Sequence, residues 1–534
     1  MKNYLLFFLL FVYSFPLLAQ QDAWVYLTDK ANVQASLDNP ISILTQKAID
    51  RKNKHGVAID ERDVPVNETY ISNLKTATGI TVMAKSKWLN AVHVRGTQTD
   101  ISNLKSNYAF VDYIDFADKS LNASKQAKQK TAIKLESVNT TFVYGNSANQ
   151  VNMINTDDLH LADYTGTGMT IAVMDAGFPG VNSIGGFQRL RNANGILGTY
   201  DFVNRSDDVY NSTENHGTLV LSTMAGFIEN SYVGTAPDAS YYLFITEDGP
   251  NENPVEESYW VEAAERADSL GVDVINTSLG YGAFYDNANY NYATTDYDGQ
   301  TIYITKGANI AFEKGMMLVN SAGNEGSAGL NAPADAAGVF TVGAVNSAGT
   351  YATFSSVGSS IQPTQKPDVV AQGQGSAVIT ENNVLASANG TSFSSPILAG
   401  GLTCLWQALP NKTNTEIMQL VRESASKYNS PDYQYGYGIP DLYATLNKVL
   451  SVRKEDINPI KVFPNPVRNM LYLQLPIMNY DFAVSFYDVL GKLVLETTAS
   501  SNKNQIDVSP LSKGLYVMKV KGVEKSITLK IIKQ

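Results

Sequence analysis

Between residues 151 and 450, short apolar runs alternate with helical segments, and this alternation most constrains the fold. The runs, rich in Val, Ile and Leu, are Thr170–Met174, Ser240–Ile245, Val272–Asn276, Met316–Ser321 and Val339–Val345. The helical segments are Thr218–Gly226, Val255–Leu270 and Tyr303–Lys314. Strands that alternate with helices form a parallel sheet with helices on both faces. Ligands of such sheets bind beyond the carboxyl ends of the strands, so functional residues are expected there.

The N-terminus has the pattern of a secretory signal peptide. Lys2 precedes an apolar run over residues 5–18, and the small residue Ala19 closes it. The run is shorter than the roughly 20 residues that a membrane-spanning helix needs. We therefore expect a signal peptide over residues 1–19 that is cleaved after Ala19. Gln20 follows in place of a cysteine, which excludes lipid attachment there, and no integral membrane segment is expected after removal of the signal.

Residues 20–118 are expected to form an α+β unit. The predicted strands are Trp24–Leu27, Thr81–Ala84, Val92–Val94 and Tyr108–Phe116, and the predicted helices are Ser42–Lys52 and Thr69–Thr78. Residues 119–150 are rich in lysine and poor in large apolar residues. They suit a linker that proteases can reach, or simply a solvated loop, and either interpretation puts a domain boundary here.

The chain changes character again near its C-terminus. Residues 451–458 form a short polar linker, and residues 459–534 are expected to form a small β-sandwich. Its predicted strands are Leu471–Leu475, Ala483–Val489, Leu493–Thr497, Gln505–Val508, Leu515–Val520 and Ser526–Ile532. Leu490-Gly491 and Lys521-Gly522 are turn signals between them.

Composition excludes some classes of protein. The formal net charge of −11 disfavours a nucleic-acid-binding protein, which needs a basic face to release counterions from phosphates. The single cysteine, Cys404, excludes an intrachain disulfide. It lies in an apolar stretch, which favours a buried core thiol over a reactive one.

Three residues of the α/β region suit acyl transfer. Asp175 ends an apolar strand, His216 begins a helical segment, and Ser392 stands at the start of an apolar helix. A serine hydroxyl becomes nucleophilic only when a base takes its proton, and the imidazole needs a carboxylate to fix its tautomer. The helix N-terminus also offers a backbone N–H and a positive dipole end to an oxyanion. We expect Pro396 to fit within the first turn of this helix, where a missing N–H costs little.

Asn324 is the predicted second donor to the oxyanion, because it follows the apolar strand Met316–Ser321. Among the four histidines only His216 has a suitable context. His55 and His93 lie in the N-terminal unit, and His160 is expected to be a packing or surface residue. No two histidines are spaced as zinc ligands, so a catalytic zinc is not expected.

These segments resemble the subtilisin-like serine peptidase family over about 300 residues. The matching motifs are Asp175 after its strand, His216-Gly217-Thr218, Ala322-Gly323-Asn324, Gly390-Thr391-Ser392 with Ser395-Pro396, Gly234-Thr235-Ala236-Pro237, and Asn276-Thr277-Ser278-Leu279-Gly280. The order Asp, His, Ser along the chain is that of this family. Three positions depart from the family pattern, since Ala176 replaces Ser or Thr, Leu219 a second histidine, and Phe393 a methionine.

The resemblance implies a parallel sheet flanked by helices and a serine endopeptidase with catalytic Asp175, His216 and Ser392 and oxyanion-binding Asn324. It also implies substrate-binding residues, which are Ser278, Leu279, Gly280, Ala322 and Gly323. The substrate backbone would pair as a strand with residues 278–280. The base of the first specificity pocket is expected near residues 331–333, where small residues leave room for an apolar side chain and Asp335 could favour a basic one.

No cofactor is required for this chemistry. Members of the family often bind structural calcium, for which Asp201, Asp207, Asp208 and Glu214 are candidates, but no loop with calcium-ligand spacing occurs. A solvated acidic loop is the alternative.

By its position, the N-terminal unit corresponds to the propeptide of the family, with an ordinary accessory domain as the alternative. The C-terminal unit resembles a type IX secretion sorting domain of Bacteroidetes-type Gram-negative bacteria. The motifs are Phe463-Pro464-Asn465-Pro466, the segment 486–492, Lys513-Gly514-Leu515-Tyr516-Val517 and the basic end 530–533. A carbohydrate-binding or adhesion sandwich is the alternative, although no line of aromatic residues marks a sugar platform.

The sequence thus predicts an exported zymogen that is a monomer, acts on proteins or peptides, and uses the type IX secretion machinery to reach the medium or the outer cell surface. The competing hypothesis is a catalytically silent surface-binding protein on the same scaffold.

Overall fold

The computed structural model describes residues 20–122, 142–455, 461–474, 482–500, 503–521 and 526–534. Residues 1–19, the predicted signal peptide, and most of the Lys-rich segment 119–150 lie outside these ranges. The chain divides into two compact units, residues 1–446 and 447–534. The finer domain boundaries given above remain predictions. No helix among the described residues is long and apolar enough to cross a bilayer.

A seven-stranded parallel sheet forms the centre of the α/β region, in the order β13-β12-β11-β10-β5-β9-β6. The strands are β5 (Thr170–Asp175), β6 (Ile196–Asp201), β9 (Ser240–Ile245), β10 (Val274–Thr277), β11 (Met317–Ser321), β12 (Val339–Val345) and β13 (Val369–Gln372). Every residue of β5, β10, β11, β12 and β13 is buried. The continuous apolar runs predict this burial for all of these strands except β13, which was not predicted.

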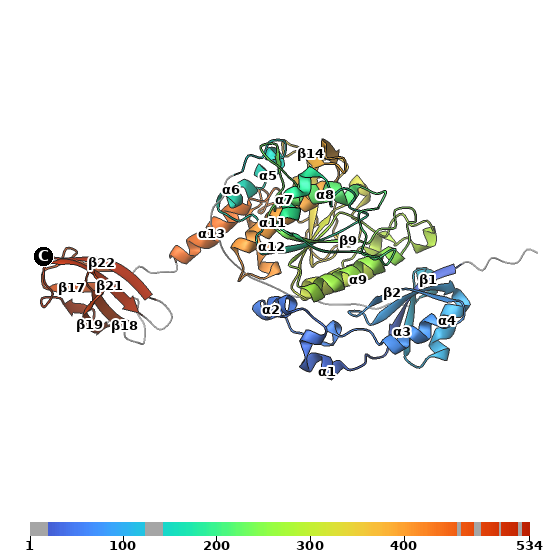
Figure 1. Ribbon diagram of the computed structural model, residues 1–534, viewed down its shortest axis with the longest axis horizontal. Helices are drawn as coiled ribbons and strands as arrows, with labels where there is room; N and C mark the ends of the chain where they lie inside the picture. Colours follow the sequence, from blue (N-terminus) through green and yellow to red (C-terminus); the bar gives the residue numbers. More distant parts are fainter. Residues whose placement is uncertain (1–19, 123–141, 456–460, 475–481, 501–502, 522–525) are drawn as a thin grey trace, which may run out of the picture. The chain divides into compact units, whose positions relative to one another are not determined.

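Helices cover the sheet, which confirms the predicted fold class (Figure 1). The principal ones are α8 (His216–Ala225), α9 (Val255–Leu270), α10 (Tyr303–Glu313) and α11 (Thr391–Ala408). All but one residue of α11 is buried, and the helix packs against β10, β11, β12 and β13. A helix that is apolar on every side can be stable only inside the core. This burial fixes the start of α11 in place.

The carboxyl edge of the sheet gathers the polar residues that the sequence singled out. β5 ends at Asp175, Ser278 follows the last residue of β10, and Asn324 follows β11. Because parallel strands end at the same edge, residues from three distant parts of the chain meet there.

The N-terminal unit has a four-stranded antiparallel sheet in the order β2-β3-β1-β4. Its strands are β1 (Gln20–Leu27), β2 (Ile80–Ser86), β3 (Ala91–Thr97) and β4 (Val111–Phe116), with helices α3 (Glu68–Lys75) and α4 (Gln98–Asn107). The predicted α+β composition is correct, although α4 was not predicted. Residues 28–63, between β1 and α3, carry α1 (Val33–Asp38) and α2 (Gln46–Lys54), and we call this segment the N-terminal arm.

The C-terminal unit has two antiparallel sheets, β16-β17-β20 and β19-β18-β21-β22. The strands are β16 (Lys461–Phe463), β17 (Met470–Gln474), β18 (Phe482–Tyr487), β19 (Leu493–Ala499), β20 (Gln505–Asp507), β21 (Gly514–Lys521) and β22 (Ser526–Lys533). One apolar cluster takes residues from both sheets, including Leu471, Phe486 and Met518. Alternating exposed and buried residues along β21 produce this shared core.

A buried ion-pair network anchors β13, the edge strand of the large sheet. Asp368, which precedes β13, binds Lys366 Nζ at 2.9 Å and Arg422 Nε at 2.9 Å, and accepts a hydrogen bond from Thr341 N at 2.8 Å. The side chains of Lys366 and Asp368 are both fully buried. Burial opposes the charge on Asp368, but the two cations outweigh it and hold the pKa of this carboxyl below its ordinary value.

We expect Asp368→Asn to destabilise the α/β region by about 3–5 kcal/mol, because two cations would lose their buried counter-charge. Thermal unfolding in a Ser392→Ala background measures the effect, so that the proteolysis expected from the sequence does not interfere. Asp432→Asn is the matched control, since Asp432 pairs with Lys427 at the surface and should cost less than about 1 kcal/mol. Equal melting temperatures for the two variants would contradict the assignment.

Candidate active site

The imidazole of His216 is held by the carboxylate of Asp175. His216 Nδ1 lies 2.7 Å from Asp175 Oδ1. Asp175 is fully buried at the end of β5, whereas the side chain of His216, the first residue of α8, is 32% exposed. The carboxylate thus fixes the side of the ring that faces the interior and leaves Nε2 free to act as a base.

The second oxygen of Asp175 has no hydrogen-bond partner. Asp175 Oδ1 accepts both from His216 and from the backbone N–H of Ala176 at 2.8 Å, but Asp175 Oδ2 is buried and unpaired. A Ser or Thr at position 176, as in the family pattern, carries a hydroxyl that Ala176 lacks.

The acidic groups around His216 favour the protonated form of its imidazole. Burial opposes protonation, but the carboxylate of Asp175 outweighs burial and raises the pKa of His216, with smaller contributions from Glu247 and Glu214. Glu247 is a further acidic group of the site that the sequence did not single out. Burial, reinforced by Glu252 and Asp175, raises the pKa of Glu247 to about 8, so its charge acts on His216 only once this carboxyl ionises at higher pH.

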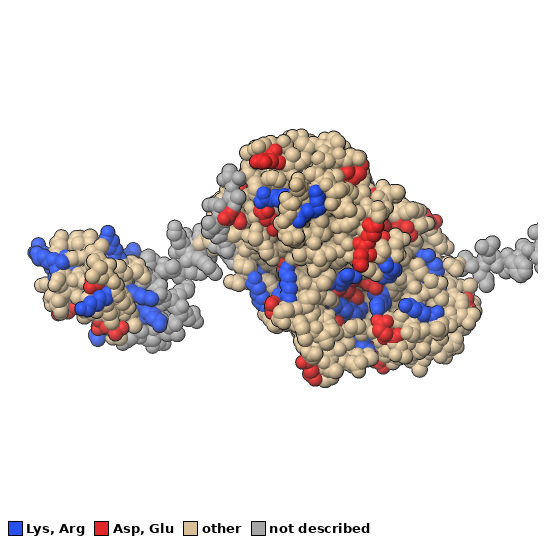
Figure 2. Space-filling view, viewed as in Figure 1, with Lys and Arg blue, Asp and Glu red and all other residues tan. Residues whose placement is uncertain are grey.

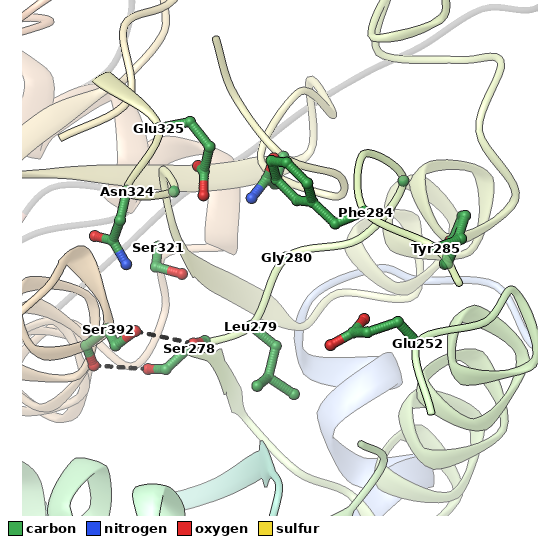
Figure 3. Close-up of a pocket in the computed structure, with 13 residues that line it drawn as sticks. Glu252, Ser278, Leu279, Gly280, Phe284, Tyr285, Ser321, Asn324, Glu325 and Ser392 are labelled. Carbon is green, nitrogen blue, oxygen red and sulfur yellow. Dashed lines mark hydrogen bonds between the residues drawn. The ribbon is translucent and has the colours of Figure 1, made fainter. Parts of the chain in front are cut away.

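Ser392 and Ser278 are paired by two reciprocal hydrogen bonds (Figure 3). Ser392 Oγ donates to the carbonyl oxygen of Ser278 at 3.1 Å, and Ser278 Oγ donates to the carbonyl oxygen of Ser392 at 2.9 Å. The second bond compensates for a proline. Pro396 stands four residues after Ser392 and has no N–H to donate to that carbonyl. The expectation that Pro396 lies in the first turn was wrong, since it is the sixth residue of α11.

Asn324 is oriented by the start of α11. Its Oδ1 accepts from Thr391 N at 2.9 Å and from Thr391 Oγ1 at 3.1 Å. With the oxygen held in this way, Nδ2 is the free end of the amide and points toward Ser392 (Figure 3). Gly323 has φ 108°, a left-handed conformation that glycine adopts without strain, and this lets the loop turn toward α11.

A cavity of about 210 Å³ adjoins Ser392. Four predicted substrate-binding residues line it, namely Ser278, Leu279, Gly280 and Gly323, together with Asn324 and Ser392. The fifth, Ala322, is fully buried in a small cluster with Leu330 and Ala334 and does not line the cavity.

The charged group at this cavity differs from the one that the sequence suggested. Asp335 is fully buried and accepts from Thr305 Oγ1 at 2.7 Å and from Gly299 N at 2.9 Å, so it does not reach the cavity. Glu325 and Glu252 line it instead, with Asn331 and the exposed Phe284. The sequence around Glu325 and Glu252 did not indicate that they line this cavity, because loops bring both carboxylates to it.

The other candidate residues have structural partners. His160 is buried and contacts the carbonyl oxygen of Thr235 at 3.1 Å, and Cys404 is buried beside it. Asp201 and Asp208 accept hydrogen bonds from backbone N–H groups that follow them. Within the described ranges, no group of three His, Cys, Asp or Glu residues is placed to hold a metal ion. Calcium binding remains an untested expectation.

Comparison with known proteins agrees with this geometry. The model for the "Subtilase family" matches residues 166–438, just over half of the chain. The chain belongs to the subtilase family. Residues 22–134 match the "Peptidase S8 propeptide domain, Bacteroidota", and residues 461–534 match the "Secretion system C-terminal sorting domain". These matches confirm the positional assignment of the N-terminal unit and the resemblance found in the C-terminal unit, and they support the organisation of a secreted serine-protease zymogen.

Several characterised proteins are similar to the α/β region. Subtilisin E of Bacillus subtilis is 29% identical over 304 residues, which cover 55% of this chain and 70% of that protein. The thermostable alkaline protease of Halalkalibacterium halodurans is 29% identical over 291 residues, covering 54% and 70%. Among solved structures, MycP1 with its N-terminal propeptide removed aligns with a TM-score of 0.46 and 20% identity, covering 56% of this chain and 96% of that one.

We expect Ser278→Ala to destabilise the protein by about 1–3 kcal/mol, because the carbonyl of Ser392 would lose the partner that replaces the absent N–H of Pro396. Thermal unfolding in the Ser392→Ala background measures this. Ser347→Ala is the control, since Ser347 is exposed on a turn. A Ser278 variant as stable as the Ser347 variant would show that the bond from Ser278 Oγ to the carbonyl oxygen of residue 392, the one bond of the pair that remains in this background, carries no free energy.

The raised pKa of His216 predicts the pH dependence of turnover. A protonated imidazole cannot accept the serine proton, so kcat/KM should rise with pH through a midpoint above about 6.5, the ordinary histidine value. A pH profile with a chromogenic peptide measures it. In Asp175→Asn the midpoint should move down, because the charge that raises the pKa is gone. A wild-type midpoint at or below 6.5 would disprove the electrostatic assignment.

Proposed function

We propose that the chain is an active endopeptidase that hydrolyses extracellular proteins through an acyl-enzyme on Ser392. The observation that carries the proposal is the convergence of four groups at one sheet edge. They are the 2.7 Å pair of His216 and Asp175, the hydroxyl of Ser392 at the start of α11, and the free amide nitrogen of Asn324.

Substrate binding would free the nucleophile. The hydroxyl of Ser392 is engaged with the carbonyl of Ser278, which belongs to the segment where a substrate strand would pair. A peptide N–H that donates to this carbonyl would displace the hydroxyl and leave it for His216 Nε2. The ring of His216 lies 6.0 Å, centroid to centroid, from that of Phe393, the residue after the nucleophile.

His216 would take the proton as Ser392 Oγ attacks the scissile carbonyl carbon. The new charge on the carbonyl oxygen would face Asn324 Nδ2 and the backbone N–H of Ser392 at the α11 N-terminus. Such donors each lower the barrier by about 3–4 kcal/mol. The imidazolium would then protonate the leaving amine, and water activated by the same base would release the acid from Ser392.

Export and maturation complete the proposal. The C-terminal unit would direct the chain through the type IX machinery to the medium or the outer surface, and the N-terminal unit would be cut away to give the mature enzyme. The matches of these two units to a sorting domain and to a propeptide support this route.

We expect a fluorophosphonate probe to form an adduct on Ser392 of the mature protein, and Ser392→Ala to remove both labelling and casein cleavage. Mass spectrometry of the labelled peptide and a casein assay measure these two outcomes. Phe393→Met serves as the control, because it changes the neighbouring volume and keeps every proposed catalytic atom.

The opposite result would favour the silent surface-binding protein. If the probe labels a known serine hydrolase in the same mixture and leaves Ser392 unmodified, the proposed catalysis is wrong. Labelling at another serine would also contradict it, because the proposal puts the nucleophile at the start of α11.

A further inference from the structure

The cavity beside Ser392 carries two acidic side chains that no cation of the described chain neutralises. Glu325 lies in the loop after β11, and Glu252 lies in the loop between β9 and α9. Within the described ranges, no Lys or Arg side chain forms an ion pair with either of them. Figure 3 shows both carboxyl groups turned toward the interior of the cavity. A hollow lined by charges of one sign concentrates ligands of the opposite sign.

Glu325 is held in position by Ser356. Glu325 N donates to Ser356 Oγ at 3.1 Å, and Ser356 Oγ donates to Glu325 Oε2 at 2.9 Å. Because Ser356 is fully buried, this pair of bonds ties the side chain of Glu325 to the core. The other carboxylate oxygen, Oε1, accepts no hydrogen bond within the described ranges and is free for a ligand. A carboxylate that is oriented before the ligand arrives loses little side-chain entropy on binding.

Glu252 is surrounded by acidic neighbours. Its backbone carbonyl accepts a hydrogen bond from Asp286 N at 2.9 Å, and this bond joins two loops beside the cavity. Burial raises the pKa of Glu252, and the charges of Asp286 and Asp248 raise it further. A cation bound in the cavity would offset this repulsion and favour the ionised form of Glu252.

Part of the cavity wall is apolar. Leu279 and Phe284 line it, and Phe284 is 66% exposed although it is a large aromatic residue. The next residue, Tyr285, donates its hydroxyl to Glu257 Oε1 at 2.8 Å, and this buried bond anchors the loop with Phe284 beside the cavity. Lysine and arginine combine an apolar stem with a charged head. Walls of this kind together with two carboxyl groups match both parts of such a side chain.

The remaining lining of the cavity is uncharged. Asn331 packs directly against Gly280, where a Cβ would lie 2.6 Å from Asn331 Cβ, so glycine is needed for this close approach. Among the described residues that line the cavity, only Glu252 and Glu325 are charged. The two glutamates therefore set the charge preference of the cavity.

The charge of the whole chain has the same sign as the cavity. The formal net charge is −11, and Figure 2 shows acidic side chains exposed on the α/β region. A negative field of this kind raises the rate of encounter with cationic substrates. The cavity and the surrounding surface thus favour the same class of ligand.

We propose that the cavity receives the side chain of the substrate residue whose carbonyl Ser392 attacks, and that Glu325 and Glu252 select lysine or arginine for this position. Ser392 and Asn324 line the same cavity, so a side chain that enters it belongs to the residue next to the reacting bond. The position of the cut rests on the proposed function, whereas binding of a cationic side chain needs no catalysis. An uncharged apolar side chain is the competing occupant.

Binding can be measured apart from catalysis in the full chain as Ser392→Ala. The probes are fluorescent octapeptides of alanine with one central lysine, norleucine or glutamate, and fluorescence anisotropy gives their Kd. We expect the lysine peptide to bind about tenfold more tightly than the norleucine peptide, and the glutamate peptide to bind most weakly. Added salt should reduce the preference for lysine and leave the norleucine peptide nearly unchanged, because only the charge pair is screened.

Glu252→Gln and Glu325→Gln should each lower the preference for lysine, and the double variant should bring it close to one. Glutamine at position 325 keeps an acceptor for Ser356 Oγ, and thermal unfolding shows that each variant is folded. Glu229→Gln is the matched control, since Glu229 is exposed on the turn between β7 (Phe227–Ile228) and β8 (Tyr232–Val233). Phe284→Ala should weaken the lysine and norleucine peptides alike, because both stems lose the same contact.

Two results would overturn the proposal. One is a norleucine peptide that binds the cavity with both glutamates intact as tightly as the lysine peptide does. The other is a preference for lysine that survives in the double variant, because the selecting charges would then lie elsewhere.

Hydrolysis by the mature protein that retains Ser392 tests the position of the cut. Chromogenic peptides should give a kcat/KM about tenfold higher after lysine than after norleucine, and mass spectrometry of casein digests should place the cuts after lysine and arginine. If the lysine peptide binds as expected and no peptide is cut, the cavity assignment stands and the proposed catalysis is wrong. Active hydrolysis chiefly after apolar residues would overturn the assignment and leave the catalysis intact.

Discussion

The reciprocal hydrogen bonds between Ser278 and Ser392 join the two parts of the site that must act together. One belongs to the segment after β10, where a substrate strand would lie, and the other to the start of the buried helix α11. Pro396 leaves the carbonyl of Ser392 without its helical partner, and the hydroxyl of Ser278 supplies one. The burial of α11 beneath the sheet and the turn at Gly323 then place the amide of Asn324 against the same helix. The position of Ser392 is thus set by packing in the core, and two hydrogen bonds fix it relative to Ser278.

Much of this architecture could be predicted because its signals are local. The apolar strand before Asp175 and the periodicity of α9 are each contained in one stretch of chain, and parallel topology then brings their ends together. β6 was missed because it is an edge strand whose residues are mostly half-buried, so its apolar pattern is weak. Glu325 at the cavity, the proton on Glu247 and the burial of Asp335 depend on contacts between distant loops. No local pattern reports such contacts, and the pairing of Ser278 with Ser392 spans 114 residues.

The carboxylate of Asp175 is incompletely hydrogen-bonded. Its second oxygen, Oδ2, is buried without a hydrogen-bond partner, and the raised pKa of the neighbouring Glu247 favours the neutral form of that carboxyl. A carboxylate with few donors interacts more strongly with the one cation that it can form a pair with, here the imidazolium of His216. Ala176 thus lacks a hydroxyl that could support the loop, and the imidazolium of His216 remains the main partner of the negative charge on Asp175.

The N-terminal arm contacts the amino edge of the large sheet at Thr170 and Asp273, and this placement has an evolutionary consequence. The residues that line the cavity beside Ser392 and the residues that contact the arm lie at opposite ends of the sheet. Under the proposed function, substitutions at the cavity would change which peptides are cut without changing the contacts of the arm, and substitutions at Asp268 or Lys314 would loosen the arm without changing the cavity. Selection could then act on each edge of the sheet separately.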